Sequence, residues 1–318
     1  MHRIKITNNR YIGNDEPCFV VAEIGINHNG DINLAKKMID MAKECGVDAV
    51  KFQTFKAKEF VSSPDETYTY KSQGREVTES MLEMFEKYEF SEEDLPIIKV
   101  GSDDLTNLEL LKYYASKNKT LIISTGMAFI SEIEDAVEII RQKGNNDLVV
   151  LHCISSYPSE PEEVNLKKML TIKQAFNVVV GFSDHTIGNI AATAAIALGA
   201  KVIEKHFTLD KNLPGPDHWF SSDPKELSQL VQAIRYTEKS LGNYVIKPTP
   251  KELKMRKIAR RSIVAARDIK KGEIITPEAL CVKRPGTGLP PKFINYILKK
   301  EAKINIKKNE LITFEKIC

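Results

Sequence analysis

Two histidines, His185 and His206, carry the strongest chemical signal in this sequence. Each follows an apolar run, so each lies where a buried strand would end, and the two are one strand-and-helix repeat apart. Ends of consecutive parallel strands meet at one mouth of a barrel, where two imidazoles could hold one divalent metal ion. Both have charged neighbours, namely Asp184, Glu204 and Lys205. These neighbours favour a shared site over two histidines that bond separately to nearby backbone.

Other polar side chains follow the predicted strands in the same way. They are Glu23, Lys51, Gln53, Lys99, Ser102, Ser124, Ser155, Tyr157 and Ser183, with Asp217 on a later loop. Each alone has a structural alternative, such as an ion pair, a lysine that reaches water, or a helix cap. Together, lysines and hydroxyls suit a phosphate or carboxylate, and histidines with carboxylates suit a metal that polarises a carbonyl. The pattern predicts a phosphorylated anionic substrate and an aldehyde or ketone partner.

The elements that position these residues are short apolar runs alternating with amphipathic, helical segments. The strand candidates are residues 18–25, 48–55, 97–102, 120–126, 148–155, 178–184 and 201–207. Continuous apolar strands are buried on both faces, which indicates a parallel sheet covered by helices. Strands alternating with helices over about 200 residues predict an α/β fold of the TIM-type (β/α) barrel class.

One interval breaks the repeat. The distance from Lys51 to Lys99 is nearly double that between the other strands, and residues 56–96 are polar and rich in Glu, Lys and Ser. Nothing in this segment has the pattern of a buried strand, so seven strands are counted where a closed barrel has eight. Either one strand has an atypical sequence or the third β/α unit is missing.

A second unit follows the barrel. We expect a barrel domain over residues 1–245, a linker with two prolines and a basic run over 246–257, and a small domain over 258–318. The last of these has short apolar runs, a KKGE turn and a loop rich in glycine and proline. A β-rich module of this size is near the lower limit of independent folding.

Composition narrows the class of protein. The chain has 318 residues and a net charge of +3, and its hydrophobic and charged fractions are 42% and 28%. We therefore expect no nucleic-acid partner and no membrane span. The N-terminal residues do not have the pattern of a signal peptide. The five cysteines are scattered: Cys18, Cys45, Cys153, Cys281 and Cys318. This spacing is typical of reduced thiols in a cytoplasmic protein.

The residues above lie in motifs that resemble the sialic acid synthase family, which includes N-acetylneuraminate, legionaminate and pseudaminate synthases. The matching motifs are AEIGINHNGD, AVKFQTF, KVGSDDLTN, ISTGMA, LHCISSYP, GFSDHTIG, EKHFTLD and GPDH. Near the C-terminus, RRSIVAARDIKKGEIIT and VKRPGTG resemble the antifreeze-like (SAF) domain of the same enzymes. The resemblance runs from about residue 15 to the end of the chain.

The resemblance implies a transferase that condenses phosphoenolpyruvate with an N-acylated hexosamine. The product would be a nine-carbon 2-keto-3-deoxy acid, with inorganic phosphate released. Positions that match the family's phosphoenolpyruvate site are Lys51, Gln53, Lys99, Ser102, Ser124 and Ser183. His185 and His206 match ligands of Mn²⁺ or Mg²⁺, and Glu23 matches a carboxylate at the reacting centre.

On the sugar side, Asp217 matches a carboxylate near the metal, and Tyr157 and Ser155 lie in the sugar-side motif. Arg284 matches an arginine that reaches the partner's active site in a domain-swapped homodimer.

The sequence departs from the family at the irregular interval. The family has a strand ending in a Ser-Thr-Pro-Phe-like motif there, and about 30 residues, one β/α unit, are absent from this chain. A closed barrel without one strand leaves two neighbours with unpaired backbone groups. A catalytically impaired, dimeric binding protein is therefore an alternative to an active synthase. A Schiff-base aldolase using Lys51 or Lys99 is a lower-ranked alternative.

Overall fold

The computed structural model describes residues 3–89 and 96–318 of the chain. It divides into two compact units, residues 1–242 and 243–318, which are considered separately below.

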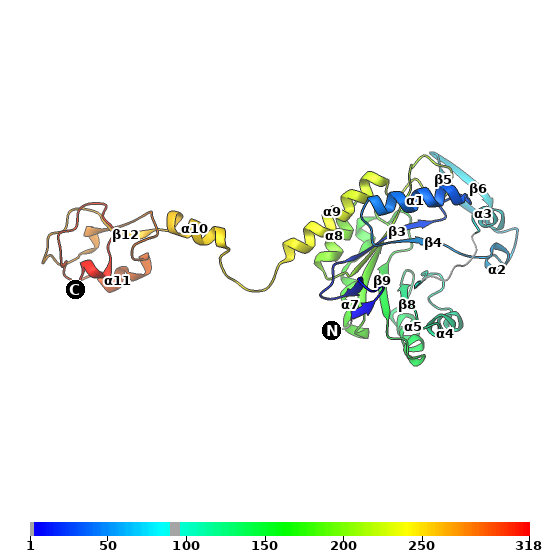
Figure 1. The fold of residues 1–318 in the computed structure, drawn as a ribbon, viewed down its shortest axis with the longest axis horizontal. Coiled ribbons are helices and arrows are strands. Elements are labelled where there is room, and N and C mark those ends of the chain that lie inside the picture. Colours follow the sequence, from blue (N-terminus) through cyan, green and yellow to red (C-terminus); the bar gives the residue numbers. More distant parts are fainter. Residues whose placement is uncertain (1–2, 90–95) are drawn as a thin grey trace. The chain divides into compact units, whose positions relative to one another are not determined.

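A parallel sheet of seven strands forms the centre of the first unit (Figure 1). Its strands are β3 (Phe19–Gly25), β4 (Ala49–Phe52), β7 (Ile97–Val100), β8 (Thr120–Ser124), β9 (Leu148–Cys153), β10 (Val179–Asp184) and β11 (Val202–His206). The order across the sheet is β4-β3-β11-β10-β9-β8-β7, so the first and last strands of the chain's repeat are neighbours, as in a barrel. The edges are β4 and β7, between which the third strand of a complete barrel would lie. The prediction of a TIM-type barrel without its third unit is confirmed.

Helices cover the outer face of this curled sheet (Figure 1). They are α1 (Ile32–Glu44), α4 (Leu108–Ala115), α5 (Ile130–Gln142), α6 (Pro161–Val164), α7 (Lys167–Phe176), α8 (Ile190–Ala197) and α9 (Pro224–Leu241). Local sequence sets their starts: Asp31 accepts a hydrogen bond from the Asn33 N–H at the start of α1, and Asp223 and Glu226 form a capping box at the start of α9. Such caps satisfy N–H groups that have no partner within the helix.

Alternate residues of each strand face opposite sides of the sheet. Val20, Ala22 and Ile24 of β3 pack against the helices, within a large apolar cluster. Phe19 and Val21 face the inside of the barrel and pack with Val149, Leu151, Val179, Val202 and Ile122. An N-terminal hairpin, β1 (Arg3–Lys5) and β2 (Tyr11–Gly13), adds Ile4 and Ile12 to this inner cluster. Apolar packing therefore fills the amino-terminal end of the barrel, and the carboxyl end is left for polar side chains.

The described residues of the irregular interval between β4 and β7 form two helices and a hairpin. The interval contains α2 (Ala57–Phe60), an antiparallel hairpin of β5 (Thr67–Ser72) and β6 (Arg75–Ser80), and α3 (Met81–Tyr88). Within the described residues, this hairpin pairs only with itself and not with the seven-stranded sheet. Most of its residues are exposed, which explains why its polar sequence lacks the pattern of a buried strand.

The second unit is small and β-rich. It contains α10 (Pro250–Ala259), a two-stranded sheet of β12 (Ser262–Ala265) and β13 (Leu280–Lys283), and α11 (Ile294–Ile297). Three single-turn helices complete it: η1 (Pro277–Ala279), η2 (Pro291–Phe293) and η3 (Phe314–Lys316). Its core is largely isoleucine, including Ile263, Ile269, Ile275, Ile306 and Ile312. Helix α10 covers much of the segment expected as a linker and has no buried residue.

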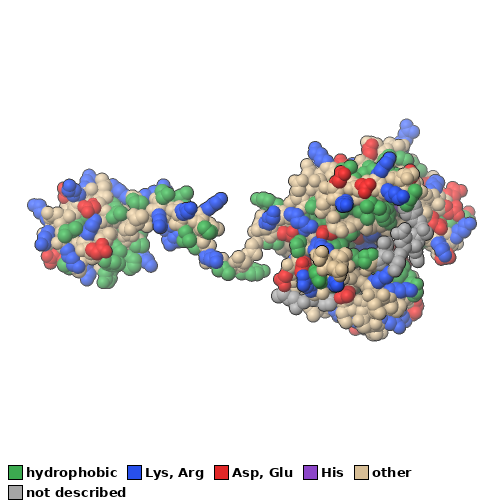
Figure 2. All heavy atoms as spheres, in the orientation of Figure 1, with side chains coloured by type: hydrophobic (Ala, Val, Ile, Leu, Met, Phe, Trp, Pro, Cys, Tyr) green, Lys and Arg blue, Asp and Glu red, His purple; other side chains and the backbone are tan. Residues whose placement is uncertain are grey.

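Lysine and arginine side chains are prominent on the surface of this small unit (Figure 2). In the part of the chain that is described, no helix has the length and apolar character needed to cross a membrane.

Candidate active site

The polar residues predicted at the strand ends meet on the inner face of the barrel, at the carboxyl end. Strand register sets this arrangement, because Glu23 lies beside both Lys51 and His206, and Ser183 lies beside Glu204. These residues continue the inward-facing alternation begun by Phe19, Val21, Val179 and Val202. Lys99, Ser124 and Cys153 occupy the equivalent inward positions of β7, β8 and β9.

Glu204 is the centre of a charge cluster. Its Oε1 lies 3.8 Å from the Lys51 ammonium and 3.7 Å from the Lys99 ammonium, and it accepts a 2.9 Å hydrogen bond from the Ser183 hydroxyl. Strand β7 is four strands from β11 in the sheet, so Lys99 reaches Glu204 only because the sheet curls. Burial would raise the pKa of Glu204, but the two ammonium groups and the hydroxyl lower it to about 2.

Sequence reasoning named Glu204 only as a charged neighbour of His206 and gave it no role. The available signal was strand alternation: Glu204 lies two residues before His206 on the same strand, and therefore on the same face.

Glu23 has the opposite electrostatic behaviour. Its carboxylate forms an ion pair with the Lys51 ammonium and is almost fully buried. Burial raises the pKa of Glu23 to about 7, with Glu204 adding to the increase and Lys51 opposing it. Burial also lowers the pKa of Lys99. The inner face thus holds one firmly ionised carboxylate and one that can exchange a proton near neutrality.

The two histidines come together as predicted, with ring centroids 5.4 Å apart. His185 Nδ1 donates to the backbone oxygen of Ile154 at 2.7 Å, which fixes its tautomer and leaves Nε2 as an electron-pair donor. His206 Nδ1 is buried without a hydrogen-bond partner in the described chain, and lies 3.8 Å from Asp217 Oδ2. Burial lowers the pKa of both imidazoles, so both are neutral, the form that binds a metal. No complete set of three metal-binding side chains is found among the residues described.

Asp217 is positioned by a network of buried polar side chains. The Ser221 hydroxyl donates to the Asp217 backbone oxygen at 2.6 Å, and Asn27 Nδ2 donates to the Ser221 hydroxyl at 3.0 Å. Burial raises the pKa of Asp217 to about 6, with Lys51 opposing the increase. A methyl group at Gly25 would lie 2.9 Å from Glu23 Oε1 and 3.8 Å from both Asp217 Oδ2 and the amide carbon of Gln53. Gln53 therefore belongs to the same cluster, and the backbone at Gly25 leaves room for it.

Serines gather around Gly126 at the end of β8. The Gly126 N–H donates to the Ser102 hydroxyl at 2.9 Å. A methyl group at Gly126 would lie 2.2 Å from the Ser155 hydroxyl and 2.8 Å from the Ser102 hydroxyl, so only glycine fits there. The Ser124 hydroxyl is buried and makes no hydrogen bond within the described chain. These hydroxyls and the Gly126 backbone form a concave polar surface of the kind that binds oxyanions.

Tyr157 and Phe220 form the outer border of the histidine pair. The Tyr157 ring is 46% exposed and lies 4.2 Å from the His185 ring, centroid to centroid. Phe220 is buried, with its ring 5.1 Å from that of His206 and 5.6 Å from that of Tyr157. Sequence reasoning missed Phe220, because a lone phenylalanine in a loop gives no signal.

Two charged neighbours of the histidines lie on the other face of the sheet. Lys205 and Asp184 face the helices as a buried ion pair of 2.9 Å, so they do not line the site beside the histidines. Arg284 is exposed on the second unit.

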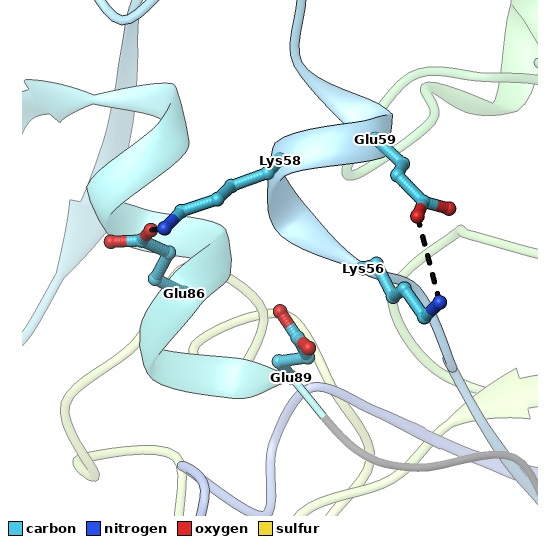
Figure 3. A pocket seen from close by; sticks show the side chains of 5 residues that line it. All are labelled: Lys56, Lys58, Glu59, Glu86 and Glu89. Carbon is cyan, nitrogen blue, oxygen red and sulfur yellow. Dashed lines mark ion pairs between the residues drawn. The ribbon is translucent and has the colours of Figure 1, made fainter.

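A separate surface pocket of about 350 Å³ lies between α2 and α3 (Figure 3). It is lined by Lys56, Lys58, Glu59, Glu86 and Glu89. Lys58 and Glu86 lie 3.8 Å apart, Lys56 and Glu59 3.5 Å apart, and Glu89 accepts a hydrogen bond from the Ala57 N–H. Its charges are largely matched within the pocket, and none of the predicted site residues lines it.

An open (β/α) barrel with imidazoles, lysines and carboxylates at the carboxyl end of its strands has the framework of a barrel enzyme. The chain belongs to the NeuB family. The family model matches residues 38–96 and 92–246, and the SAF domain model matches residues 260–317. The NeuB match is broken where the sequence predicts the missing unit.

The chain is also similar along most of its length to synthases of known name. The chain is 40% identical to the N,N'-diacetyllegionaminic acid synthase of Legionella pneumophila, over 98% of each chain. It is 42% identical to the synthase of the same name from Campylobacter jejuni, over 92% of this chain and 98% of the relative. Among solved structures, the N-acetylneuraminic acid synthetase of Leptospira borgpetersenii matches with a TM-score of 0.70 and 31% identity, over 80% of this chain and 96% of that one.

Proposed function

We propose that the protein is a phosphoenolpyruvate-dependent synthase of the sialic acid type. C3 of phosphoenolpyruvate bonds to the aldehyde carbon of an N-acylated hexosamine, water adds at C2, and inorganic phosphate leaves. The product is a nine-carbon 2-keto-3-deoxy acid. The observation that carries this proposal is the convergence of Lys51 and Lys99 on one carboxylate oxygen, beside the paired imidazoles, in a chain of this family.

Phosphoenolpyruvate requires cationic and hydroxyl partners, and the inner face supplies both. Lys51 and Lys99 are assigned to its carboxylate and phosphate, with Gln53 and the serines at positions 102, 124 and 183 as hydrogen-bonding partners. Glu204 supports this assignment because it holds both ammonium groups at the barrel centre before substrate arrives. Preorganised charge of this kind stabilises developing charge without reorganisation during the reaction.

The chemistry of the donor set fits a divalent ion, for which we propose Mn²⁺ or Mg²⁺. His185 Nε2 and His206 Nδ1 would hold it, because both are neutral nitrogens without a strong competing bond. When bound, the ion supplies Lewis acidity that draws electron density from the sugar aldehyde.

Glu23 and Asp217 are proposed to act at the reacting atoms. A carboxylate with a pKa of about 7 can accept a proton from the water that adds at C2, and its charge can also stabilise a cationic C2. Asp217, next to His206, is assigned to the sugar hydroxyls near the aldehyde.

For the acceptor, we propose an N-acylhexosamine of the N-acetylmannosamine or 2,4-diacetamido type. The named activity of the Legionella and Campylobacter relatives favours the diacetamido sugar. We also propose a domain-swapped homodimer, in which Arg284 of one chain completes the site of the other, and a cytoplasmic location.

One observation favours a second candidate, a catalytically impaired relative that acts as a dimeric binding protein. Strands β4 and β7 are the open edges of the sheet, and no strand in the described chain takes the place between them. Since Lys51 and Lys99 lie on these two edge strands, the gap borders the proposed phosphoenolpyruvate site.

Phosphate release separates the two candidates. The protein is incubated with Mn²⁺, phosphoenolpyruvate and a panel of N-acylhexosamines, with EDTA-treated enzyme as the control. The synthase releases phosphate only when both an acceptor and the metal are present. An impaired relative binds ligands without releasing phosphate. Activity that survives EDTA, with borohydride trapping of pyruvate, would instead indicate a Schiff-base aldolase.

A further inference from the structure

The hairpin β5–β6 packs on the loop that carries Asp217. The Gly215 N–H donates to the Ser72 hydroxyl at 3.1 Å, and Gln73 Nε2 donates to the backbone oxygen of Asn212 at 3.1 Å. These bonds join the segment between β4 and β7 to the mouth of the barrel. No sequence motif predicts this contact, because the two partners are about 140 residues apart.

An aromatic row leads from the histidines to the same hairpin. The Phe220 ring lies 5.1 Å from His206, and Trp219 packs edge-on against Phe220 at 5.7 Å. The Lys71 ammonium of β5 then lies 5.3 Å from the Trp219 ring centre. Such a cation–π contact holds an indole in place at a partly exposed site.

Two ring separations, 5.1 Å from His206 to Phe220 and 5.7 Å from Phe220 to Trp219, place Trp219 within about 11 Å of His206. An open-chain hexose spans roughly 6–7 Å from C1 to C6 at the reach per bond of an extended chain. Phe220 is buried and offers little surface to a ligand, whereas Trp219 is partly exposed. A hexosamine whose aldehyde lies at His206, lengthened by an acylamido group at its far end, reaches toward Trp219. Aromatic rings bury the apolar surface of such a ligand while its hydroxyls remain free to hydrogen-bond.

We propose that Trp219, held by Lys71, is a specificity-determining residue that packs against an acylamido substituent at the far end of the acceptor. This inference rests on the proposed function and adds the residue that recognises the far substituent of the acceptor. A diacetamido sugar gains from this contact, because its second acetyl methyl group buries apolar area that a hydroxyl lacks.

The test uses the full chain and two readouts. Trp219 is the only tryptophan, so its fluorescence reports on the proposed contact directly. Without phosphoenolpyruvate, we expect a saturable emission change with a 2,4-diacetamido hexose and at least a tenfold weaker apparent affinity for N-acetylmannosamine. Lys71→Met should weaken binding of the diacetamido sugar at least threefold. Tyr236→Phe, at an exposed tyrosine of α9, should leave the affinity unchanged.

Steady-state kinetics provides the second readout. Trp219→Ala should raise the KM of the diacetamido acceptor at least tenfold and leave the KM of phosphoenolpyruvate within twofold. Trp219→Phe keeps an aromatic ring and is the control for misfolding. It should restore the acceptor KM most of the way to the wild-type value.

The outcomes separate this inference from the proposed function. Turnover with an acceptor KM that is unchanged in Trp219→Ala overturns the inference and leaves the synthase assignment standing. A diacetamido-dependent emission change without any phosphate release overturns the synthase assignment and supports the distal contact. A preference for an acceptor phosphorylated at C6, or no emission change with any sugar, overturns the inference.

Discussion

Replacing Glu23 with glutamine should stabilise the fold and abolish turnover. Glu23 is 1% exposed, and its pKa rises from 4.5 to about 7 because the folded barrel disfavours its charged form. The native state therefore holds this proton more tightly than the unfolded chain does, and stability falls as pH rises from about 4.5 to 7. One pKa unit corresponds to about 1.4 kcal/mol, so ionisation of Glu23 costs about 2 kcal/mol more at pH 8 than at pH 5.5.

The assay is urea unfolding in EDTA, followed by Trp219 fluorescence, at these two pH values. Glu23→Gln removes the titration but keeps the shape of the side chain. Its stability relative to wild type should increase by about 2 kcal/mol between pH 5.5 and pH 8. Glu134→Gln, at an exposed glutamate of α5, is the matched control. Its difference in unfolding free energy from wild type should be small and the same at pH 5.5 and pH 8. A Glu23→Gln difference that does not change with pH would refute the reasoning, and undiminished turnover would refute the catalytic role.

Three further predictions test the metal ligands, the serine cluster and a buried ion pair outside the site. His206→Ala should weaken Mn²⁺ binding, measured by electron paramagnetic resonance, at least tenfold; His152→Gln, at a buried imidazole that bonds to the Val164 backbone, should bind normally. If His206→Ala binds Mn²⁺ like wild type, the assigned ligand pair is wrong. Gly126→Ala places a methyl group against Ser155, on the sugar side, and Ser102, in the proposed phosphoenolpyruvate site, and should raise the KM of both substrates at least tenfold; KM values within twofold of wild type would show that these serines do not contact substrate. Asp184→Asn leaves the buried Lys205 ammonium without its carboxylate and should cost about 3–5 kcal/mol in urea unfolding. A loss below about 1 kcal/mol would show that this pair is solvated.

The sequence was sufficient to predict the barrel and most of the site because both depend on local patterns. Apolar runs identified the strands, and polar residues at their ends identified the mouth of the barrel. His185 and His206 could be paired because neighbouring parallel strands end at the same edge. The absence of one unit could be predicted because the polar segment between Lys51 and Lys99 has no pattern of a buried strand.

What remained hidden depends on the curvature of the sheet and on contacts between distant segments. Lys99 on β7 lies close to Glu204 on β11 only because the sheet curves over the four strand intervals between them. No local sequence pattern predicts this curvature. Asp184 and Lys205 are neighbours of the histidines in sequence, but alternation along β10 and β11 directs them to the helices. The contact between Ser72 and Gly215 joins two polar segments that are far apart in the chain, and composition does not specify that they pair.

The most direct test of the central claim is product analysis of a complete reaction. The protein is incubated with Mn²⁺, phosphoenolpyruvate and 2,4-diacetamido hexose or N-acetylmannosamine, and the mixture is examined by mass spectrometry and phosphorus NMR. We predict a nine-carbon 2-keto-3-deoxy acid and one inorganic phosphate per molecule of product, despite the open edge between β4 and β7. Intact phosphoenolpyruvate after incubation with either acceptor would contradict the account.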